Sequence, residues 1–143
     1  MRRAIAEEKG DKDPWDIKYV AGGMVDLEFI AQYLQLVHAH EKHAILETHT
    51  GRVLENAVAL GLVARADGDI LRAAFTLYHD VTQVLRLCLP RKFEPAKGGP
   101  GLLALLARAG ELPDFPRLEA HMIDTQRKVR QIFEKIIGGA VNP

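Results

Sequence analysis

The chain has 143 residues, a length that fits one domain with a single hydrophobic core. Lysine plus arginine and aspartate plus glutamate each number 19, so the formal net charge is zero, which argues against a protein that binds nucleic acid mainly through phosphates. Charged or polar residues interrupt every apolar stretch, and MRRAIAEEKG at the start has no apolar signal core, so we expect neither a membrane partner nor export.

The first part of the sequence predicts a short helix, a turning segment and a long apolar helix. Residues 2–8 are expected to be helical, and GDKDP at 10–14 breaks that helix with Gly, Asp and Pro. WDIKYVAGG at 15–23 is then a short turning segment that leads to a helix from Met24 to about Ala39. That helix has two apolar faces, with Leu27, Ile30, Leu34 and Val37 on one and Phe29, Tyr33 and Leu36 on the other. A helix apolar over so much of its circumference is expected at the centre of a bundle.

Two further helices are predicted in the middle of the chain. Thr50 is expected to be the N-cap of a helix that ends near Gly61, and Asp67 or Asp69 is expected to cap the next helix, which runs to Leu89. The single cysteine, Cys88, excludes an internal disulfide, fits a reducing cytoplasm and is expected as a buried thiol. The buried face of the second helix is predicted to comprise Leu71, Phe75, Tyr78, Val81 and Leu85.

The last third of the sequence predicts a long loop and two more helices. LPRKFEPAKGGPG at 89–101 holds three prolines and three glycines and is expected to be irregular. GLLALLARAG at 101–110 is a short apolar helix ended by its last glycine, and Pro116 is expected to start a long helix that stops at the glycine pair 138–139. The solvent-exposed face of that last helix is predicted to carry Arg127, Lys128 and Arg130.

Taken together, these elements predict an all-α fold. No stretch alternates with a period of two over the length of a strand, and the fold class is a helical bundle of about five helices with one long Pro/Gly-rich loop. The domain limits are expected to be a leading segment and linker at 1–23, the bundle at 24–139 and a short tail at 140–143.

Several residues invite a metal, but their spacing favours simpler interpretations. His38, His40 and His43 form H-x-H-x-x-H with His49 nearby, yet histidines two apart point to different sides of a helix, and metal ligands on one helix favour a spacing of four. Histidine also suits a helix end for electrostatic reasons. Asp67-Gly-Asp69 is similar to the metal-binding D-x-D of nucleotidyltransferases, but no strand is available to carry it, and helix capping explains it.

An HD-type metal phosphohydrolase is an alternative that we keep open. His79-Asp80 lies in a predicted helix, and an all-helical fold with H…HD…D resembles that class of enzyme. Asp124 is the candidate for the second carboxylate, although helical geometry alone also accounts for a histidine beside an apolar stripe.

The run DPWDIKYVAGGMVDLEFIAQYLQLVHAHE closely resembles a segment of the bacterial glutamine synthetase adenylyltransferase family. That family has a K-x-x-x-GG-x-x-D-[IL]-EF-x-x-Q pattern where a nucleotidyltransferase domain passes into a helical bundle, and HMIDTQRKVRQIFEKIIGG is similar to its closing helix. FIAQYLQLVHAHE resembles the second, adenylylating half of the enzyme, and the deadenylylating half is the alternative within the family. This sequence has Ala21 where many members carry arginine. The matching residues are Lys18, Gly22, Gly23, Asp26, Leu27, Glu28, Phe29 and Gln32.

The resemblance implies that this chain is the C-terminal helical domain of an enzyme that transfers AMP from ATP to a tyrosine of glutamine synthetase. PII signal protein and glutamine act as regulators of that family, and Mg²⁺ and ATP are held by an upstream nucleotidyltransferase domain. No catalytic residue is therefore expected in this chain, which is predicted to be inactive alone and to pack against the catalytic domain. A free-standing helical interaction module, which binds a partner without nucleotide chemistry, is the other alternative.

Five of the matching residues are candidates for contact with a nucleotide or with the neighbouring domain: Lys18, Gly22, Gly23, Asp26 and Glu28. The two glycines permit a tight turn and close backbone approach. The helix start that follows is expected to offer free N–H groups and a dipole that favour an anion. The alternative is that Asp26 caps the helix and that Glu28 pairs with a nearby cation such as Lys18.

Overall fold

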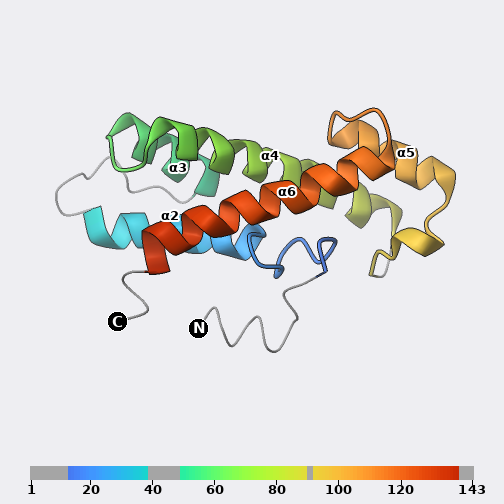
Figure 1. Ribbon diagram of the computed structural model, residues 1–143, viewed down its shortest axis with the longest axis horizontal. Helices are drawn as coiled ribbons and strands as arrows, with labels where there is room; N and C mark the ends of the chain where they lie inside the picture. Colours follow the sequence, from blue (N-terminus) through green and yellow to red (C-terminus); the bar gives the residue numbers. More distant parts are fainter. Residues whose placement is uncertain (1–12, 39–48, 90–91, 139–143) are drawn as a thin grey trace.

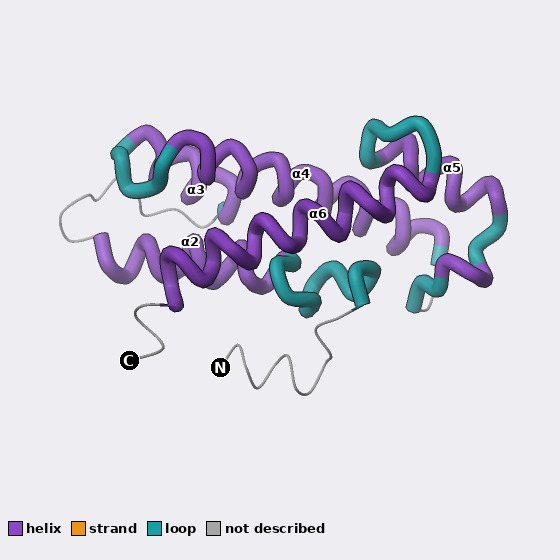
Figure 2. Tube along the Cα trace, viewed as in Figure 1, coloured by secondary structure: helices purple, strands orange, loops and turns teal. Residues whose placement is uncertain are grey.

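The structure, a computed structural model, describes residues 13–38, 49–89 and 92–138. Within these ranges it contains five α-helices and no strand (Figure 1, Figure 2), which confirms the all-α fold class. None of the helices in the same ranges is long and apolar enough to cross a lipid bilayer. The predicted helix at 2–8, the histidines His40 and His43 and the tail at 140–143 lie outside the described residues.

The helices follow the predicted order along the chain. They are α2 (Met24–His38), α3 (Thr50–Ala59), α4 (Arg65–Cys88), α5 (Pro100–Ala109) and α6 (Phe115–Phe133). The predicted loop before α5 contains one 3₁₀ turn, Pro95–Lys97, and α6 continues into a π-helical turn, Glu134–Gly138. Asp114 caps α6 by accepting a hydrogen bond from the backbone N–H of Arg117 at 2.9 Å.

The start of α4 differs from the prediction, because the helix begins at Arg65 rather than after an aspartate cap. The reason is Gly68, where a Cβ atom would lie 2.0 Å from Cγ2 of Val58 in α3. This glycine therefore lets two helices approach closely instead of marking a turn. Asp67 lies in the first turn of α4, where a carboxylate suits the helix dipole, and it forms an ion pair with Lys135.

Two smaller predictions are also wrong. Thr50 is the first residue of α3, and His49 takes the N-cap position in its place. Cys88 is exposed rather than buried, because α4 reaches beyond the core at its C-terminal end, where Leu87 is 85% exposed. The thiol is therefore in solvent.

Helices α4 and α6 form the centre of the bundle, in place of α2, which was predicted there but whose far end is exposed at Leu36 and Val37. In Figure 1 they run along the long axis of the molecule, with α3 at one end and α5 at the other. Contacts join α4 to each of the other helices, and α6 to α2 and α5. The predicted faces of α2 and α4 supply much of the core, although Leu36 and Val37 at the end of α2 are exposed. The largest fully buried side chains are Tyr78, Leu27, Ile30, Leu54, Leu71, Leu106, Leu118 and Met122.

Candidate functional site

The double glycine lies where the turning segment before α2 meets α6. Gly22 has φ +79°, in the left-handed region that glycine adopts without strain. A Cβ atom at Gly22 would lie 1.8 Å from the backbone oxygen of Gln126, and one at Gly23 would lie 2.2 Å from the backbone oxygen of Ile17. The glycines thus permit close backbone approach, as the sequence predicted. The surfaces that they approach here are the chain's own helix α6 and its own turn.

The first N–H groups of α2 are not free. The N–H groups of Met24 and Val25 donate hydrogen bonds of 2.9 Å to the carbonyl oxygens of Ile17 and Lys18. The expectation of free N–H groups that attract an anion is therefore wrong, because the turn in front of the helix supplies the acceptors. This helix start is closed by its own chain.

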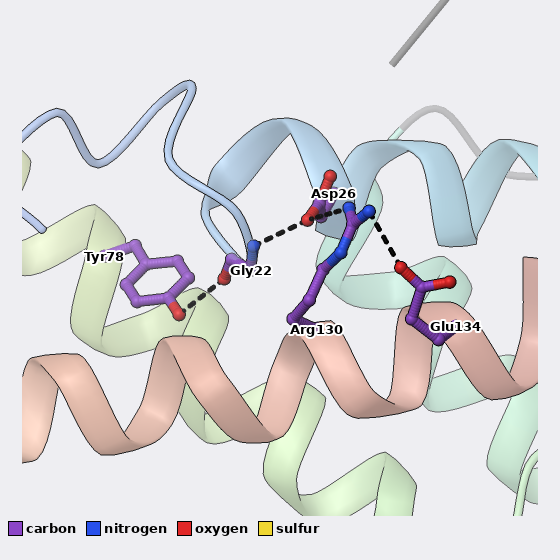
Figure 3. A network of polar contacts seen from close by, with 5 residues as sticks. All are labelled: Gly22, Asp26, Tyr78, Arg130 and Glu134. Atoms are coloured by element: carbon purple, nitrogen blue, oxygen red, sulfur yellow. Dashed lines mark hydrogen bonds and ion pairs between the residues drawn. The ribbon is translucent and has the colours of Figure 1, made fainter. Parts of the chain in front are cut away.

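Asp26 is the centre of a buried polar network (Figure 3). Its side chain is 0% exposed, and its Oδ2 accepts a hydrogen bond of 2.6 Å from the Gly22 N–H and one of 3.1 Å from Nη1 of Arg130. The other guanidinium nitrogen of Arg130, Nη2, pairs with Oε1 of Glu134 at 2.8 Å. A buried carboxylate is costly unless it is paired in this way. Arg130 is therefore partly buried and joins α6 to α2, which corrects its predicted place on the solvent-exposed face.

Tyr78 on α4 completes the network from the other side of Gly22. Its hydroxyl donates a hydrogen bond of 2.7 Å to the Gly22 carbonyl oxygen. Burial raises the pKa of the phenol well above its ordinary value, and the negative charge of Asp26 raises it further. The hydroxyl group consequently stays protonated and acts as a donor. Gly22 is held through both its N–H and its carbonyl.

A second anchor fixes the beginning of the turning segment. The indole Nε1 of Trp15 donates a hydrogen bond of 2.9 Å to Oε2 of Glu119. The Trp15 ring also stacks on Phe115 with 5.2 Å between ring centroids. Nε2 of Gln126 donates to the Pro14 carbonyl oxygen at 2.8 Å. Residues 13–23 are thus bonded to α6 at their beginning and to α2 and α4 at their end, so their conformation is fixed relative to the bundle.

The five candidate residues divide into two sets. Gly22, Gly23 and Asp26 are buried where the turning segment packs on α6, a region that we call the corner. Lys18 is exposed and Glu28 is partly exposed. Those two line a groove of about 350 Å³ between the turning segment and α4. Within the described ranges, neither Lys18 nor Glu28 forms an ion pair, so the predicted Lys18–Glu28 pair is absent there. Contact of these five residues with a nucleotide or a neighbouring domain stays a prediction.

The residues considered for a phosphohydrolase site do not gather into one cluster. His79 and Asp80 are exposed on α4. Asp124 accepts a hydrogen bond of 2.8 Å from Nη2 of Arg127 and pairs with Nζ of Lys128 at 3.0 Å, and these bonds lower its pKa. In the described part of the chain, no three His, Cys, Asp or Glu side chains gather as a metal site would require.

The sequence did not predict the roles of three residues of the corner, Tyr78, Gln126 and Arg130. Tyr78 was predicted to be buried, and a buried hydroxyl needs a partner, which is the one available signal. Gln126 lies in the buried stripe of α6, and Arg130 lies one turn farther along. Neither position identifies its partner, because those partners are 112 and 104 residues away in the sequence.

Comparison with known proteins identifies a matching family model and similar sequences. A family model described as GlnD PII-uridylyltransferase matches residues 1–137. The chain is 57% identical, over 97% of its length, to a bifunctional glutamine synthetase adenylyltransferase/adenylyl-removing enzyme of Rhodopseudomonas palustris strain TIE-1. It is 55% identical to the enzyme with this description from Bradyrhizobium diazoefficiens and 53% identical to that of Xanthobacter autotrophicus, over 97% and 96% of the chain. The chain spans 14% of the length of each of these relatives.

Proposed function

Because the chain belongs to the GlnD PII-uridylyltransferase family, we propose that it is a helical domain of a glutamine synthetase adenylyltransferase. In that role it supports transfer of AMP from ATP to a tyrosine of glutamine synthetase. The observation that carries the proposal is the 57% identity over 97% of the chain to an enzyme with that description. The family model names uridylyl transfer to PII, and we follow the relatives because their identity to this chain is high across nearly all of it.

The chemistry itself belongs to another part of the polypeptide. Mg²⁺ and ATP are assigned to a nucleotidyltransferase domain, whose carboxylates hold the metal against the triphosphate. The described residues of this chain do not fit such a site, since Asp26 is committed to Arg130 and no group of metal-binding side chains gathers there. We infer that the domain alone is inactive and that its task is to pack against the catalytic domain in the cytoplasm. PII signal protein is the proposed regulatory partner.

We assign the domain to the adenylylating half because FIAQYLQLVHAHE resembles that half of the family. The buried corner supports an architectural role rather than a catalytic one. Gly22, Gly23 and Asp26 fix the segment that leads into the bundle, and Lys18 and Glu28 remain at the surface beside it. These last two are the residues available for contact with another domain.

A segment exchange tests the proposal. In the Rhodopseudomonas palustris enzyme, the matching 14% of the length is replaced by this chain, and AMP transfer from labelled ATP to glutamine synthetase is measured. We expect the chimera to retain transfer within a few-fold of the parent. Deletion of the same segment is the control, and it should abolish transfer while removal of AMP from modified glutamine synthetase continues.

Two results would overturn the proposal in different ways. A folded chimera as inactive as the deletion variant would show that this chain does not serve adenylylation. Loss of AMP removal with intact AMP addition on deletion would assign the segment to the deadenylylating half.

A further inference from the structure

A second hollow in the surface lies between α3 and α4, and we call it the α3–α4 cleft. Its volume is about 680 Å³, and the described residues that line it belong to α3, to its N-cap His49 and to the first half of α4. It shares none of these residues with the groove beside Lys18, and no described residue of the turning segment lines it. The cleft is therefore separate from the corner and from the groove beside it.

Two contacts fix how α3 and α4 face each other across this cleft. Gly68 lies against Val58 near the turn that joins the helices, and Nη2 of Arg72 pairs with Oε1 of Glu55 at 3.6 Å farther from that turn. Residue numbers thus rise along α4 as they fall along α3, so the two helices are antiparallel. This register determines the order of the charges along the cleft.

The two ends of the α3–α4 cleft carry opposite charges. Arg52 lies nearly one helical turn before Glu55, and the imidazole of His49 lines the same end. Asp69 lies nearly one turn before Arg72, on the side of the joining turn. The Arg72–Glu55 pair lies between these ends, and its side chains are 48% and 56% exposed, so it contributes little stability and is accessible to polar groups of a partner.

Phe75 gives the cleft an apolar contact among these charges. Its ring is partly buried and lies 5.6 Å from the His49 ring, between centroids. Gly51 of α3 and Ala73 of α4 line the same cleft and have no bulky side chain. An apolar contact within a charged, exposed rim is typical of an interface between proteins. A site for a small molecule is usually enclosed and lined mainly by apolar groups, so the cleft fits a macromolecular partner better.

The dimensions of the cleft fit a helix. Asp69 and Thr76 both line it and are seven residues apart on α4, which corresponds to about 10 Å, or two helical turns. A partner helix can therefore place an acidic group near Arg52 and a basic group two turns away near Asp69, with an apolar side chain against Phe75. Such helix-in-groove contacts are a common mode of protein recognition.

We propose that the α3–α4 cleft binds a surface helix of glutamine synthetase, with the acidic, apolar and basic groups in that arrangement. The inference rests on the proposed function and names the surface of this domain that meets the target protein. A single tyrosine offers an enzyme few contacts, so selection of one target protein requires binding energy from parts of that protein remote from the reacting group. Because the turning segment does not line the cleft, binding there leaves the corner and its groove uncovered.

Photo-crosslinking in the chimeric enzyme tests the contact without relying on activity. The crosslinking residue p-benzoylphenylalanine replaces Thr76, which is exposed in the cleft, and in a matched sample it replaces Gln131, an exposed residue of α6 outside the cleft. With glutamine synthetase present, we expect the probe at Thr76 to crosslink to one of its surface helices, identified by mass spectrometry, and the probe at Gln131 to form few or no crosslinks. Equal yields from the two positions, or crosslinks from Thr76 only to other parts of the enzyme, would overturn the proposal.

Charge reversal separates docking from chemistry in the same enzyme. Arg52→Glu is expected to raise the KM for glutamine synthetase by roughly tenfold and to leave kcat unchanged, because it removes contacts made equally before and during the reaction. The helix itself should tolerate this change, since a carboxylate is favoured in the first turn of α3. Arg65→Glu, at an exposed arginine outside the cleft, is the control and should leave both constants unchanged. An equal rise of KM in the two variants would contradict the docking cleft.

The two proposals fail in distinguishable ways. If the chimera transfers AMP and Arg52→Glu leaves KM unchanged, the docking cleft is wrong and the proposed function stands. If the chimera transfers no AMP but the probe at Thr76 crosslinks to glutamine synthetase, the docking cleft stands and the proposed function fails.

Discussion

Within the described residues, two turns contain a glycine in the left-handed region, and their surroundings differ. Gly22 has φ +79° and precedes α2, and Gly61 has φ +75° and lies between α3 and α4. A Cβ atom at Gly22 would lie 1.8 Å from the Gln126 oxygen, whereas one at Gly61 would meet no described atom within 4 Å. Gly61 therefore serves the backbone conformation alone. Gly22 serves the conformation and also the docking of a segment onto α6.

The carboxylates near these two turns show the same contrast. Asp26 is 0% exposed and is paired with Arg130, whereas Asp67 follows the α3–α4 turn and is paired with Lys135, whose side chain is 63% exposed. Removing one partner of a buried pair leaves an uncompensated charge, while an exposed partner is simply hydrated. The comparison indicates that a glycine turn followed by a paired aspartate contributes much or little to stability according to its burial.

The largest expected difference between the regions comes from adding one methyl group. Gly22→Ala should lower the free energy of unfolding by about 4 kcal/mol or more, because left-handed strain adds to a clash with a backbone atom that cannot move away. Gly61→Ala should lower it by only about 1–2 kcal/mol, from the strain alone. Urea unfolding followed by circular dichroism measures both. Equal losses for the two variants would contradict the account.

Truncation of the two aspartates sharpens the contrast. Asp26→Ala should lower the free energy of unfolding by about 3–5 kcal/mol, since Arg130 and the Gly22 N–H are left without their acceptor. Asp67→Ala should lower it by no more than about 1 kcal/mol, as is typical of solvent-accessible pairs. The check is the shift of the urea midpoint at constant slope. A loss at Asp67 that matched the loss at Asp26 would show that burial does not govern these pairs.

A smaller effect is expected at Tyr78. Tyr78→Phe should lower the free energy of unfolding by about 1–3 kcal/mol, because the buried Gly22 carbonyl loses its donor while the ring remains packed. Tyr33→Phe, at a partly exposed tyrosine on α2, is the matched control and should be close to neutral. Thermal unfolding of the three proteins decides. If Tyr78→Phe is also neutral, the hydroxyl does not hold the corner.

The decrease of the free energy of unfolding at alkaline pH depends on the same hydroxyl. Because burial and then Asp26 raise the Tyr78 pKa above its ordinary 10.0, the unfolded state loses the phenol proton first. The stabilisation is complete below pH 10 and declines above it, by up to about 1.4 kcal/mol per pH unit. Tyr78→Phe should lack this part of the slope, which urea titrations between neutral and alkaline pH would reveal. Parallel pH profiles for the two proteins would contradict a buried phenol.

The helices were predictable because each has a periodic apolar face. The double glycine likewise indicated a close backbone approach, and the family pattern correctly identified the fold and the relatives. What approaches Gly22 was not predictable from local sequence, because Tyr78 is 56 residues away and Arg130 is 104 residues from Asp26. The local sequence around Arg130 is the same whether its side chain faces water or a buried carboxylate.

The errors at helix starts have a similar cause. Asp-Gly-Asp at 67–69 has the composition of a turn, but Gly68 lies inside α4 and packs on Val58 of α3. Tertiary contact therefore overrode the turn preference of the residues.

The residues of the family pattern also differ in burial: Gly22 and Asp26 are buried, whereas Lys18 and Glu28 line the groove. A sequence pattern does not distinguish the residues that build a surface from those that lie on it.

Amide hydrogen exchange at Gly22 is the most direct test of the claim that the double glycine is an internal anchor. Its N–H is buried against Asp26, whereas the Gly61 N–H is bonded to the Val58 carbonyl oxygen in an exposed turn. The Gly22 N–H is expected to exchange only when the bundle unfolds globally, and the Gly61 N–H is expected to exchange orders of magnitude faster. Exchange at Gly22 as fast as at Gly61 would show that the corner opens freely, which contradicts the account.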